Sequence, residues 1–176
     1  MQTLQERNHQ VEVVDLYGEE FQPSLTGTER KSYHTESYDT SLVTKQIEQL
    51  KKAEALVLVF PTWWFGFPAM LKGWFDRVWV PGVAFDQPTD FRPIKPRLDK
   101  LRRTLVITTL GVPWWVDKII MQQPVKKIVK SALLGACARK SKLDFLSLYN
   151  SDKVNGSDIQ RFSEKIQQTL HTWERS

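Results

Sequence analysis

Two short segments of this 176-residue chain place aromatic and hydroxyl side chains directly behind apolar runs. Pro61–Phe67 follows the run Ala55–Phe60 and contains three consecutive aromatic residues. Leu110–Trp115 follows the run Arg103–Thr109, which ends in two threonines. Aromatic rings in such loops can stack on a planar ring, and the polar groups beside them can hydrogen-bond its edge. The two loops predict a slot for a flat heteroaromatic ligand, although the same aromatics are equally compatible with capping the edge of a sheet.

Side chains that could act as nucleophiles, general bases or metal ligands are sparse. Cys137 lies between two alanines in a predicted helix, which favours a structural role. His9, His34 and His171 lie in polar segments, which favours surface positions over general bases. No Cys and His cluster predicts a metal site, and neither a Gly-rich dinucleotide fingerprint nor a P-loop is present. The sequence therefore assigns no catalytic residue and no metal.

Composition and charge narrow the class of protein. Hydrophobic residues make up 41% and charged residues 26% of the chain, which is typical of a globular domain. The longest apolar run, Ala55–Pro61, is far shorter than the ~20 residues of a membrane helix. With a single cysteine and no export signal, the chain is expected to be soluble and cytoplasmic, without membrane insertion. The net charge of +5 comes with no basic stripe or docking motif, so no nucleic-acid partner is expected, whereas anionic small molecules such as dinucleotides fit.

Hydrophobic periodicity predicts strands that alternate with helices. Strands are predicted at residues 10–16, 55–60, 103–109 and 143–149, and the continuous apolar run 55–60 is expected to be covered on both faces. Helices are predicted at residues 40–52 and 68–79, from 124, and from a capping box at 157–160, with residues 18–39 and 83–100 as irregular loops. The predicted core faces are Met70, Leu71, Trp74, Phe75, Val78 and Trp79 in one helix and Ile159, Phe162, Ile166, Leu170 and Trp173 in the last. The alternation predicts one α/β domain over residues 1–176, a doubly wound parallel sheet with its ligand at the carboxyl ends of the strands.

The segment Phe60–Val78 is similar to a signature of the flavodoxin-like NAD(P)H:quinone oxidoreductases. Val11–Tyr17, Pro81–Phe85 and Thr108–Gly111 also resemble segments of that family, in the same order. The resemblance extends from about residue 9 onward. It implies a flavodoxin-like fold that holds FAD or FMN noncovalently and reduces quinones by two-electron hydride transfer from NAD(P)H, in ping-pong turns.

The resemblance also implies site residues and an oligomeric state. The implied cofactor-binding residues are Pro61, Thr62, Trp63, Trp64 and Phe65, which would flank the isoalloxazine ring, and Thr108, Thr109 and Gly111, near its pyrimidine side. A homodimer is implied, and Trp74, Trp79 and Phe85 are expected to supply apolar surface for it. The partner is a quinone-like small molecule, and the resemblance leaves open FAD or FMN, NADH or NADPH, and the acceptor.

Three features depart from the resembled family. The chain begins where the family's first helix ends, so the opening strand and the phosphate-binding loop have no counterpart, and that strand would be central, between Val11–Leu16 and Ala55–Phe60. Leu110 stands where the family usually has glycine and is expected to narrow the loop. The Tyr and His pair of animal members has no match in Val112–Lys118, so no proton donor is assigned.

Two other hypotheses remain open at this stage. Some members of the resembled family are cytoplasmic ancillary subunits of potassium-efflux systems, so a regulatory role toward a membrane protein is the alternative to an enzyme. The 176 residues could also represent part of a longer natural protein with a full flavin site. An absorption spectrum of the purified protein would separate the enzyme from the regulatory subunit.

We expect this 176-residue chain to bind FAD or FMN weakly or not at all. Hydrogen bonds to charged groups contribute ~1.5–3 kcal/mol each, and the lack of two or three phosphate contacts would raise the dissociation constant of a nanomolar site to micromolar or beyond. Titration calorimetry with FAD and FMN measures this. Submicromolar binding would contradict the prediction and would mean that other residues hold the phosphates.

Overall fold

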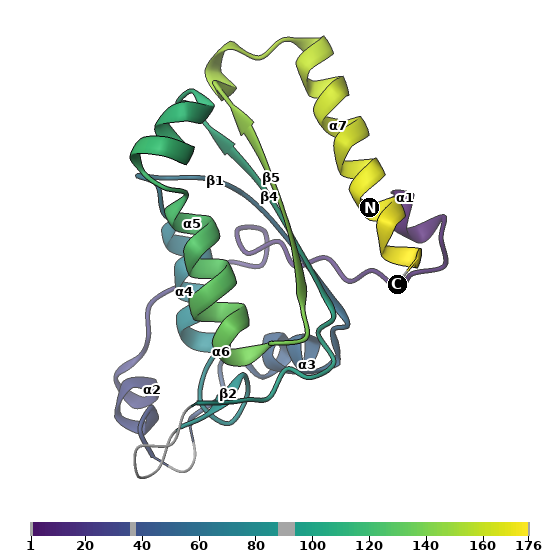
Figure 1. Cartoon of the computed structure of the whole chain (residues 1–176). Helices are drawn as coiled ribbons and strands as arrows, with labels where there is room; N and C mark the ends of the chain where they lie inside the picture. Colours follow the sequence, from purple (N-terminus) through teal and green to yellow (C-terminus); the bar gives the residue numbers. More distant parts are fainter. Residues whose placement is uncertain (1, 36–37, 88–93, 176) are drawn as a thin grey trace.

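A computed structural model of the chain describes residues 2–35, 38–87 and 94–175. Its centre is a parallel three-stranded sheet of β1 (Ala55–Pro61), β4 (Arg103–Leu110) and β5 (Lys142–Tyr149), in the order β1-β4-β5. The apolar runs predicted as strands form these three strands, and all three point to the same end of the molecule (Figure 1). A second sheet pairs two short antiparallel strands, β2 (Phe85–Asp86) and β3 (Lys95–Pro96). The remainder of the predicted loop at 83–100 includes residues 88–93, which lie outside the described residues.

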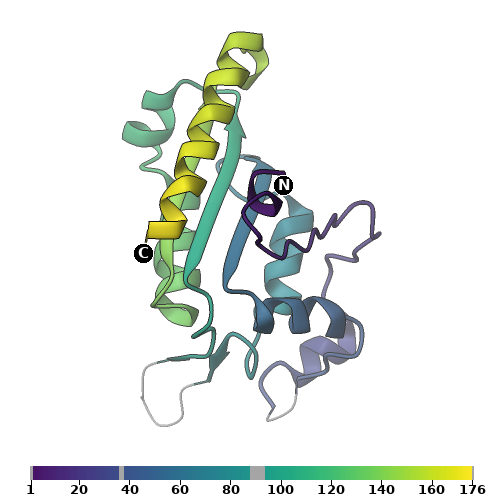
Figure 2. The same cartoon turned by 90° about the vertical axis from the view of Figure 1, so that its right-hand side faces the viewer.

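Helices cover both faces of the sheet, as the doubly wound prediction requires (Figures 1 and 2). One face carries α3 (Thr44–Lys52), α4 (Ala69–Val78) and a continuous helical segment made of α5 (Pro124–Lys127), the π-helix η2 (Ile128–Leu134) and α6 (Gly135–Cys137). The other face carries α7 (Gly156–His171) beside the short α1 (Gln2–Gln5). Three shorter elements are η1 (Val116–Ile120), η3 (Ser151–Lys153) and η4 (Thr172–Arg175).

The larger core lies between the sheet and α3, α4 and the segment α5–α6. Five of the six residues predicted to face this core in and after α4 are buried, and the sixth, Met70, packs against them. Trp74 and Trp79 are 8% and 5% exposed and form edge-to-face contacts with each other and with Phe75. The expectation that Trp74 and Trp79 provide surface for a dimer is therefore wrong, because this chain's own core buries them, and Phe85 is also half-buried against that core.

The smaller core lies between the sheet and α7. Leu105, Leu146 and Leu170 are buried there, and Leu4, Phe162, Ile166 and Trp173 pack around them. Ile159 was predicted to join this face, but it is 52% exposed. The predicted capping box at residues 157–160 is also wrong, because Asn155 caps the helix by accepting a hydrogen bond from the Asp158 N–H, while the Asp158 side chain accepts one from the Asn155 N–H.

The segment predicted as the first strand, residues 10–16, forms no strand. It follows Asn8, whose φ angle of 60° is left-handed, and then runs through non-regular backbone. A strand needs a neighbouring strand for its hydrogen bonds, and no described segment lies beside this one in a sheet. For the same reason β1 is an edge strand within the described residues, and Val57 and Val59 on its open face are 37% and 72% exposed. The expectation that β1 is covered on both faces is wrong.

The irregular segment 18–39 contains a helix that the sequence reading missed, α2 (Gly27–Ser32). Thr26 and Glu29 form a reciprocal capping box, a signal that is visible in the sequence. Glu29 also binds the Arg77 side chain of α4, with 2.8 Å between Arg77 Nε and Glu29 Oε1, and Arg77 donates to the Gln22 carbonyl oxygen and lies over the Phe21 ring. Both charged groups are buried, so this ion pair attaches the segment to α4.

Protonation of Glu29 is coupled to this ion pair. Burial alone would raise the pKa of Glu29, but the hydrogen bonds from Arg77 and Thr26 outweigh burial and hold the pKa below its ordinary value of 4.5. A carboxylate with a lowered pKa stabilises the fold above its unfolded-state pKa, and that stabilisation is lost as the pH falls through the folded-state pKa.

We predict that Arg77→Met lowers the free energy of unfolding at pH 7 by roughly 3–5 kcal/mol, because it leaves Glu29 buried without its partner. Urea unfolding measures the change. The deficit should shrink as the pH falls toward 4.5 and below, because Glu29 of the variant, buried without Arg77, takes up a proton more readily than in the wild type. Lys72→Met, which breaks an exposed pair with Asp76 on the same helix, is the matched control and should cost under ~0.5 kcal/mol. Equal losses in the two variants would contradict the importance of the buried pair.

Candidate functional site

The register of β1 and β4 brings the two predicted loops to one edge of the sheet. Pro61 lies opposite Thr109 in the parallel pairing, so both strands end at the same level. Beyond this pair, the Thr62 N–H donates to the Thr109 carbonyl oxygen at 2.9 Å. The hydroxyl oxygens of Thr62 and Thr108 are 2.7 Å apart. The structure thus places Pro61, Thr62, Thr108 and Thr109 together, as the sequence predicted.

A tight two-residue turn follows Thr62. The Trp63 N–H donates to the Gly66 carbonyl oxygen at 3.1 Å, and the Gly66 N–H donates back to the Trp63 carbonyl oxygen at 2.7 Å. The two central residues, Trp64 and Phe65, have φ angles of 47° and 55°. Turns of this geometry usually carry Asn and Gly, because left-handed backbone costs other residues about 1–2 kcal/mol each. Two aromatic residues in this turn are therefore a local strain that the rest of the fold must offset.

The turn exposes two indoles, and the partly buried Phe67 anchors it. Trp63 and Trp64 are 62% and 97% exposed, and Phe65 is half-buried. Phe67 anchors the chain behind the turn, with ring centroids 5.5 Å from Phe60 and 5.1 Å from Phe75. Strained backbone and exposed aromatic rings are features of binding sites, where they are kept for a ligand. The turn can present one indole face to a planar molecule.

The exit of β4 divides into buried and accessible residues. Thr108 is 1% exposed and its hydroxyl binds Thr62, so a ligand cannot reach this side chain. Thr109 is half-buried and Gly111 is exposed. Leu110 is buried beside Val125, Phe145, Thr62 and Thr108, around a void of only about 10 Å³. The expectation that Leu110 narrows the loop is wrong, because its side chain turns under the sheet edge.

Gly111 permits close packing of the loop that follows β5. A Cβ atom at Gly111 would lie 2.8 Å from Asp152 Oδ1, closer than real Cβ contacts come. The Asn150 N–H donates to the Val112 carbonyl oxygen at 3.1 Å and holds the same two loops together. The candidate site therefore involves three loops, because the loop after β5 joins the two that the sequence predicted.

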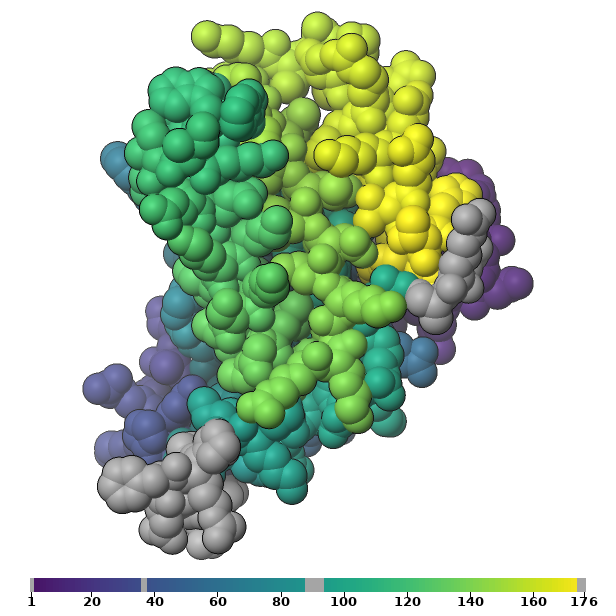
Figure 3. Space-filling model, viewed as in Figure 1, coloured from purple at the N-terminus to yellow at the C-terminus, as the bar shows by residue number. Residues whose placement is uncertain are grey.

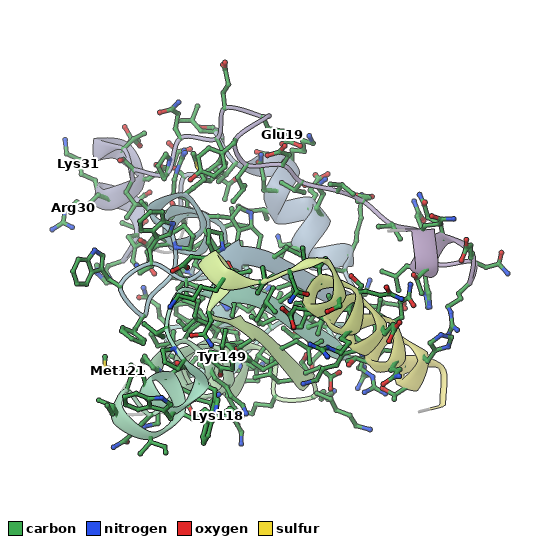
Figure 4. The ribbon with its side chains drawn as sticks, turned by 90° about the horizontal axis from the view of Figure 1, so that it is seen from above. Glu19, Arg30, Lys31, Lys118, Met121 and Tyr149 are labelled. Atoms are coloured by element: carbon green, nitrogen blue, oxygen red, sulfur yellow. The ribbon has the colours of Figure 1, made fainter. Side chains whose placement is uncertain are left out.

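A protruding apolar segment lies beside these loops. Trp114, Trp115, Ile119, Ile120 and Met121, which we call the apolar corner, are 52%, 46%, 64%, 60% and 40% exposed. They lie in η1 and directly before and after it, at one corner of the molecule (Figures 3 and 4). The Lys118 Nζ lies 5.9 Å from the centre of the Trp114 ring.

The buried Asp117 holds this segment to the sheet. Tyr149 at the end of β5 donates its hydroxyl to Asp117 Oδ2 at 2.8 Å. Burial, together with the bond to Asp117, raises the pKa of Tyr149, although other hydrogen bonds lower it in part. Neither residue was predicted. The only signal was an acid inside the apolar run 114–121.

The cysteine and the three histidines occupy positions of the kinds predicted for them. Cys137 is 3% exposed and burial raises the pKa of its thiol, which fits the structural role. His9, His34 and His171 are exposed. The described residues contain no group of three or more His, Cys, Asp or Glu side chains that could hold a metal ion. No helix in the described part of the chain has the length and apolar character needed to cross a membrane.

Comparisons with known proteins place this geometry in context. The chain matches a family described as having the flavodoxin-like fold over residues 1–175. It is 40% identical over 85 residues to an uncharacterised NAD(P)H oxidoreductase, YcaK, of Escherichia coli, which covers 48% of this chain and 43% of that protein. It is 37% identical over 128 residues to NAD(P)H dehydrogenase (quinone) 1 of Cavia porcellus, which covers 63% of this chain and 46% of that protein. The matched parts are thus less than half the length of these relatives.

A solved structure shares the fold at low identity. An FMN-dependent NADH-azoreductase from Bacillus anthracis, in complex with FMN, has a TM-score of 0.71 and 17% identity, and the match covers 91% of this chain and 79% of that one. At this identity the likeness supports the fold alone. The fold predicted from the sequence is confirmed, since the family match and this structure agree on it.

We predict that Trp64→Asn raises the free energy of unfolding by about 1 kcal/mol. Asn tolerates left-handed backbone, and an almost fully exposed indole loses little packing when it is removed. Trp63→Asn, one residue earlier and without a positive φ, is the control and should not stabilise the fold. Thermal or urea unfolding of both variants measures the difference. No stabilisation in Trp64→Asn would mean that the turn is not strained in solution.

Proposed function

The chain belongs to the family with the flavodoxin-like fold, and on this premise we propose that it is a flavin-dependent NAD(P)H oxidoreductase that reduces quinones or similar acceptors. The strained turn at Trp63–Gly66, which shows its indoles to solvent beside Thr109 and Gly111, is the observation that carries the proposal. The names of the two relatives, an NAD(P)H oxidoreductase and an NAD(P)H dehydrogenase (quinone), support the same reaction class.

The residues present fit the planar part of a flavin. Trp63, Trp64 and Phe65 offer aromatic surface on one side, and the backbone after Pro61 provides hydrogen-bonding groups at the ring's edge. Thr109 and Gly111 are accessible on the neighbouring loop. When bound, a flavin supplies a carrier that accepts a hydride from NAD(P)H and passes two electrons to a quinone. FMN is the favoured form, because an enzyme of this fold binds it, and FAD is the second candidate.

This chain's own residues orient and shield the ring. The Trp63–Gly66 turn fixes the plane in which a ring can stack, because its two backbone hydrogen bonds and the Phe67 anchor hold it in place. Backbone N–H groups of the Thr109–Gly111 segment favour negative charge on the ring's polar edge. Thr108 is a positioning residue, since its hydroxyl binds Thr62 and no ligand can reach it.

We retain the homodimer as a proposal, with different residues. The apolar corner exposes two indoles and three aliphatic side chains beside the proposed flavin site, and exposed patches of this kind mark interaction surfaces. A second copy of the chain would cover it and exclude water from the ring. Light scattering should give about twice 20.5 kDa at micromolar concentration, and a monomeric mass would contradict the dimer.

The relatives named above are oxidoreductases, and they give no support to the alternative role as a regulatory subunit of a potassium-efflux system.

We propose a cytoplasmic location for the enzyme, where NAD(P)H is available and a lone thiol such as Cys137 stays reduced.

Our prediction for the activity is NAD(P)H oxidation by benzoquinone when the protein is supplied with excess FMN or FAD. Trp64→Ala should lower kcat/KM by about tenfold, because stacking on an aromatic residue contributes roughly 1–3 kcal/mol. Tyr17→Ala, which removes another exposed aromatic residue that belongs to neither of the two loops, is the control. Flavin absorption that shifts on binding in the wild type and not in Trp64→Ala would support the site. Equal activity in the two variants would overturn the assignment of the turn.

A further inference from the structure

A groove of about 660 Å³ lies between the end of β5 and the first turns of α7. Lys153, Arg161 and Lys165 line it, together with Tyr149, Asn150 and Phe162. None of these residues was predicted to be part of a site. The chain passes from β5 to α7 at the end of the molecule where β1 and β4 also end (Figure 1), and Asn150, Lys153 and Val154 of this connection line the groove.

The charge of the groove is positive. Asp158 is the one carboxylate on its wall, and its side chain already accepts from the Asn155 N–H and pairs with Arg161. The hydrogen bond from the Asn155 N–H, and after it the bond from Arg161, hold the pKa of Asp158 below its ordinary value. Asp158 therefore stays charged, and the charge of Arg161 balances it. Within the described residues Lys153 and Lys165 form no ion pair. Two lysine charges are therefore available to an anion.

The residues that line the groove neighbour those of the candidate site. Leu148, on its wall, lies opposite Thr109 in the pairing of β4 with β5, and Tyr149 lies opposite Leu110. The loop that forms its floor packs on Gly111, through Asp152, and on Val112, through the Asn150 N–H. β5 lies two strand spacings of ~4.8 Å each from β1, so the β5 wall of the groove is roughly 10 Å from the strand that leads into the Trp63–Gly66 turn.

We propose that this groove binds the phosphate or diphosphate group of a nucleotide whose ring lies at the Trp63–Gly66 turn. The inference rests on the proposed function, and it names the residues that hold the charged end of the ligand. Lysine and arginine bind phosphate oxygens by charge-assisted hydrogen bonds, and the Phe162 wall contacts the less polar part of the ligand. A flavin phosphate and the diphosphate of NAD(P)H share this chemistry, so the test must distinguish them.

The test is calorimetry on the full chain and on the triple variant Lys153→Gln, Arg161→Gln, Lys165→Gln, with FMN, riboflavin, NADPH and ADP as ligands. The matched control removes three exposed lysines elsewhere, Lys31→Gln, Lys51→Gln and Lys52→Gln. Circular dichroism checks that each variant is folded. Riboflavin carries the same ring without phosphate, so it isolates the contribution of the groove.

We expect the wild type and the control to bind FMN at least about tenfold more tightly than riboflavin. The triple variant should lose that preference and bind the two ligands within about twofold. A loss confined to NADPH and ADP would assign the groove to the electron donor, and it would support the proposal through the other source of phosphate. Higher salt should weaken FMN binding in the wild type more than in the triple variant.

The outcomes separate this inference from the proposed function. If the protein binds riboflavin, and the triple substitution leaves the binding of FMN, NADPH and ADP unchanged, the assignment of the groove is overturned. The ring site at the turn then still stands. ADP binding that depends on the three cations, with no binding of riboflavin or FMN, would support the groove and count against the flavin enzyme. Absence of binding by all four ligands would overturn the groove.

Discussion

The parallel hydrogen bonding of β1 with β4 is the constraint on which the rest of the candidate site depends. Because Pro61 lies opposite Thr109, the chain leaves both strands at one level, and the bond from the Thr62 N–H to the Thr109 carbonyl oxygen extends the pairing into the loops. A shift by one residue would turn Thr62 and Thr108 to opposite faces. The two hydroxyl oxygens are 2.7 Å apart, so the register of β1 and β4 is maintained as far as Thr62.

Other parts of the fold keep this register by fixing the elements that follow the strands. Phe67 packs between Phe60 and Phe75, so one cluster of three aromatic rings holds both the turn after β1 and the helix α4. Arg77, at the other end of α4, binds Glu29, and Gly73 allows Pro23 to pack directly against the helix, where a Cβ atom would lie 2.2 Å from the Pro23 carbonyl oxygen. The long segment between α1 and α3 thus acts as a brace for α4.

The sequence predicted well those parts of the fold whose signals are local or repeat along the chain. The apolar runs gave β1, β4 and β5, and the spacing of Leu71, Trp74 and Val78 gave the buried face of α4. It failed where the outcome depends on a neighbour in space, as in residues 10–16, whose alternating pattern finds no strand to pair with in the described part of the chain. For the candidate site, the loops could be predicted from their place after buried strands. The burial of Thr108 and Leu110 and the groove beside Lys153 could not, because they depend on which face each residue takes and on how the loop after β5 packs.

The open edge of β1 has a consequence for the exchange of backbone hydrogens with solvent. In a parallel pair, alternate residues of an edge strand direct their N–H groups toward the partner and the others away from it. Amides of β1 that face β4 are therefore held by hydrogen bonds, whereas those between them face outward beside the exposed Val57 and Val59. β4, with a neighbour on each side, has its amides engaged along its length. Deuterium would accordingly enter β1 at every second residue long before it enters β4, and that alternation is the fingerprint of an edge strand in a parallel sheet.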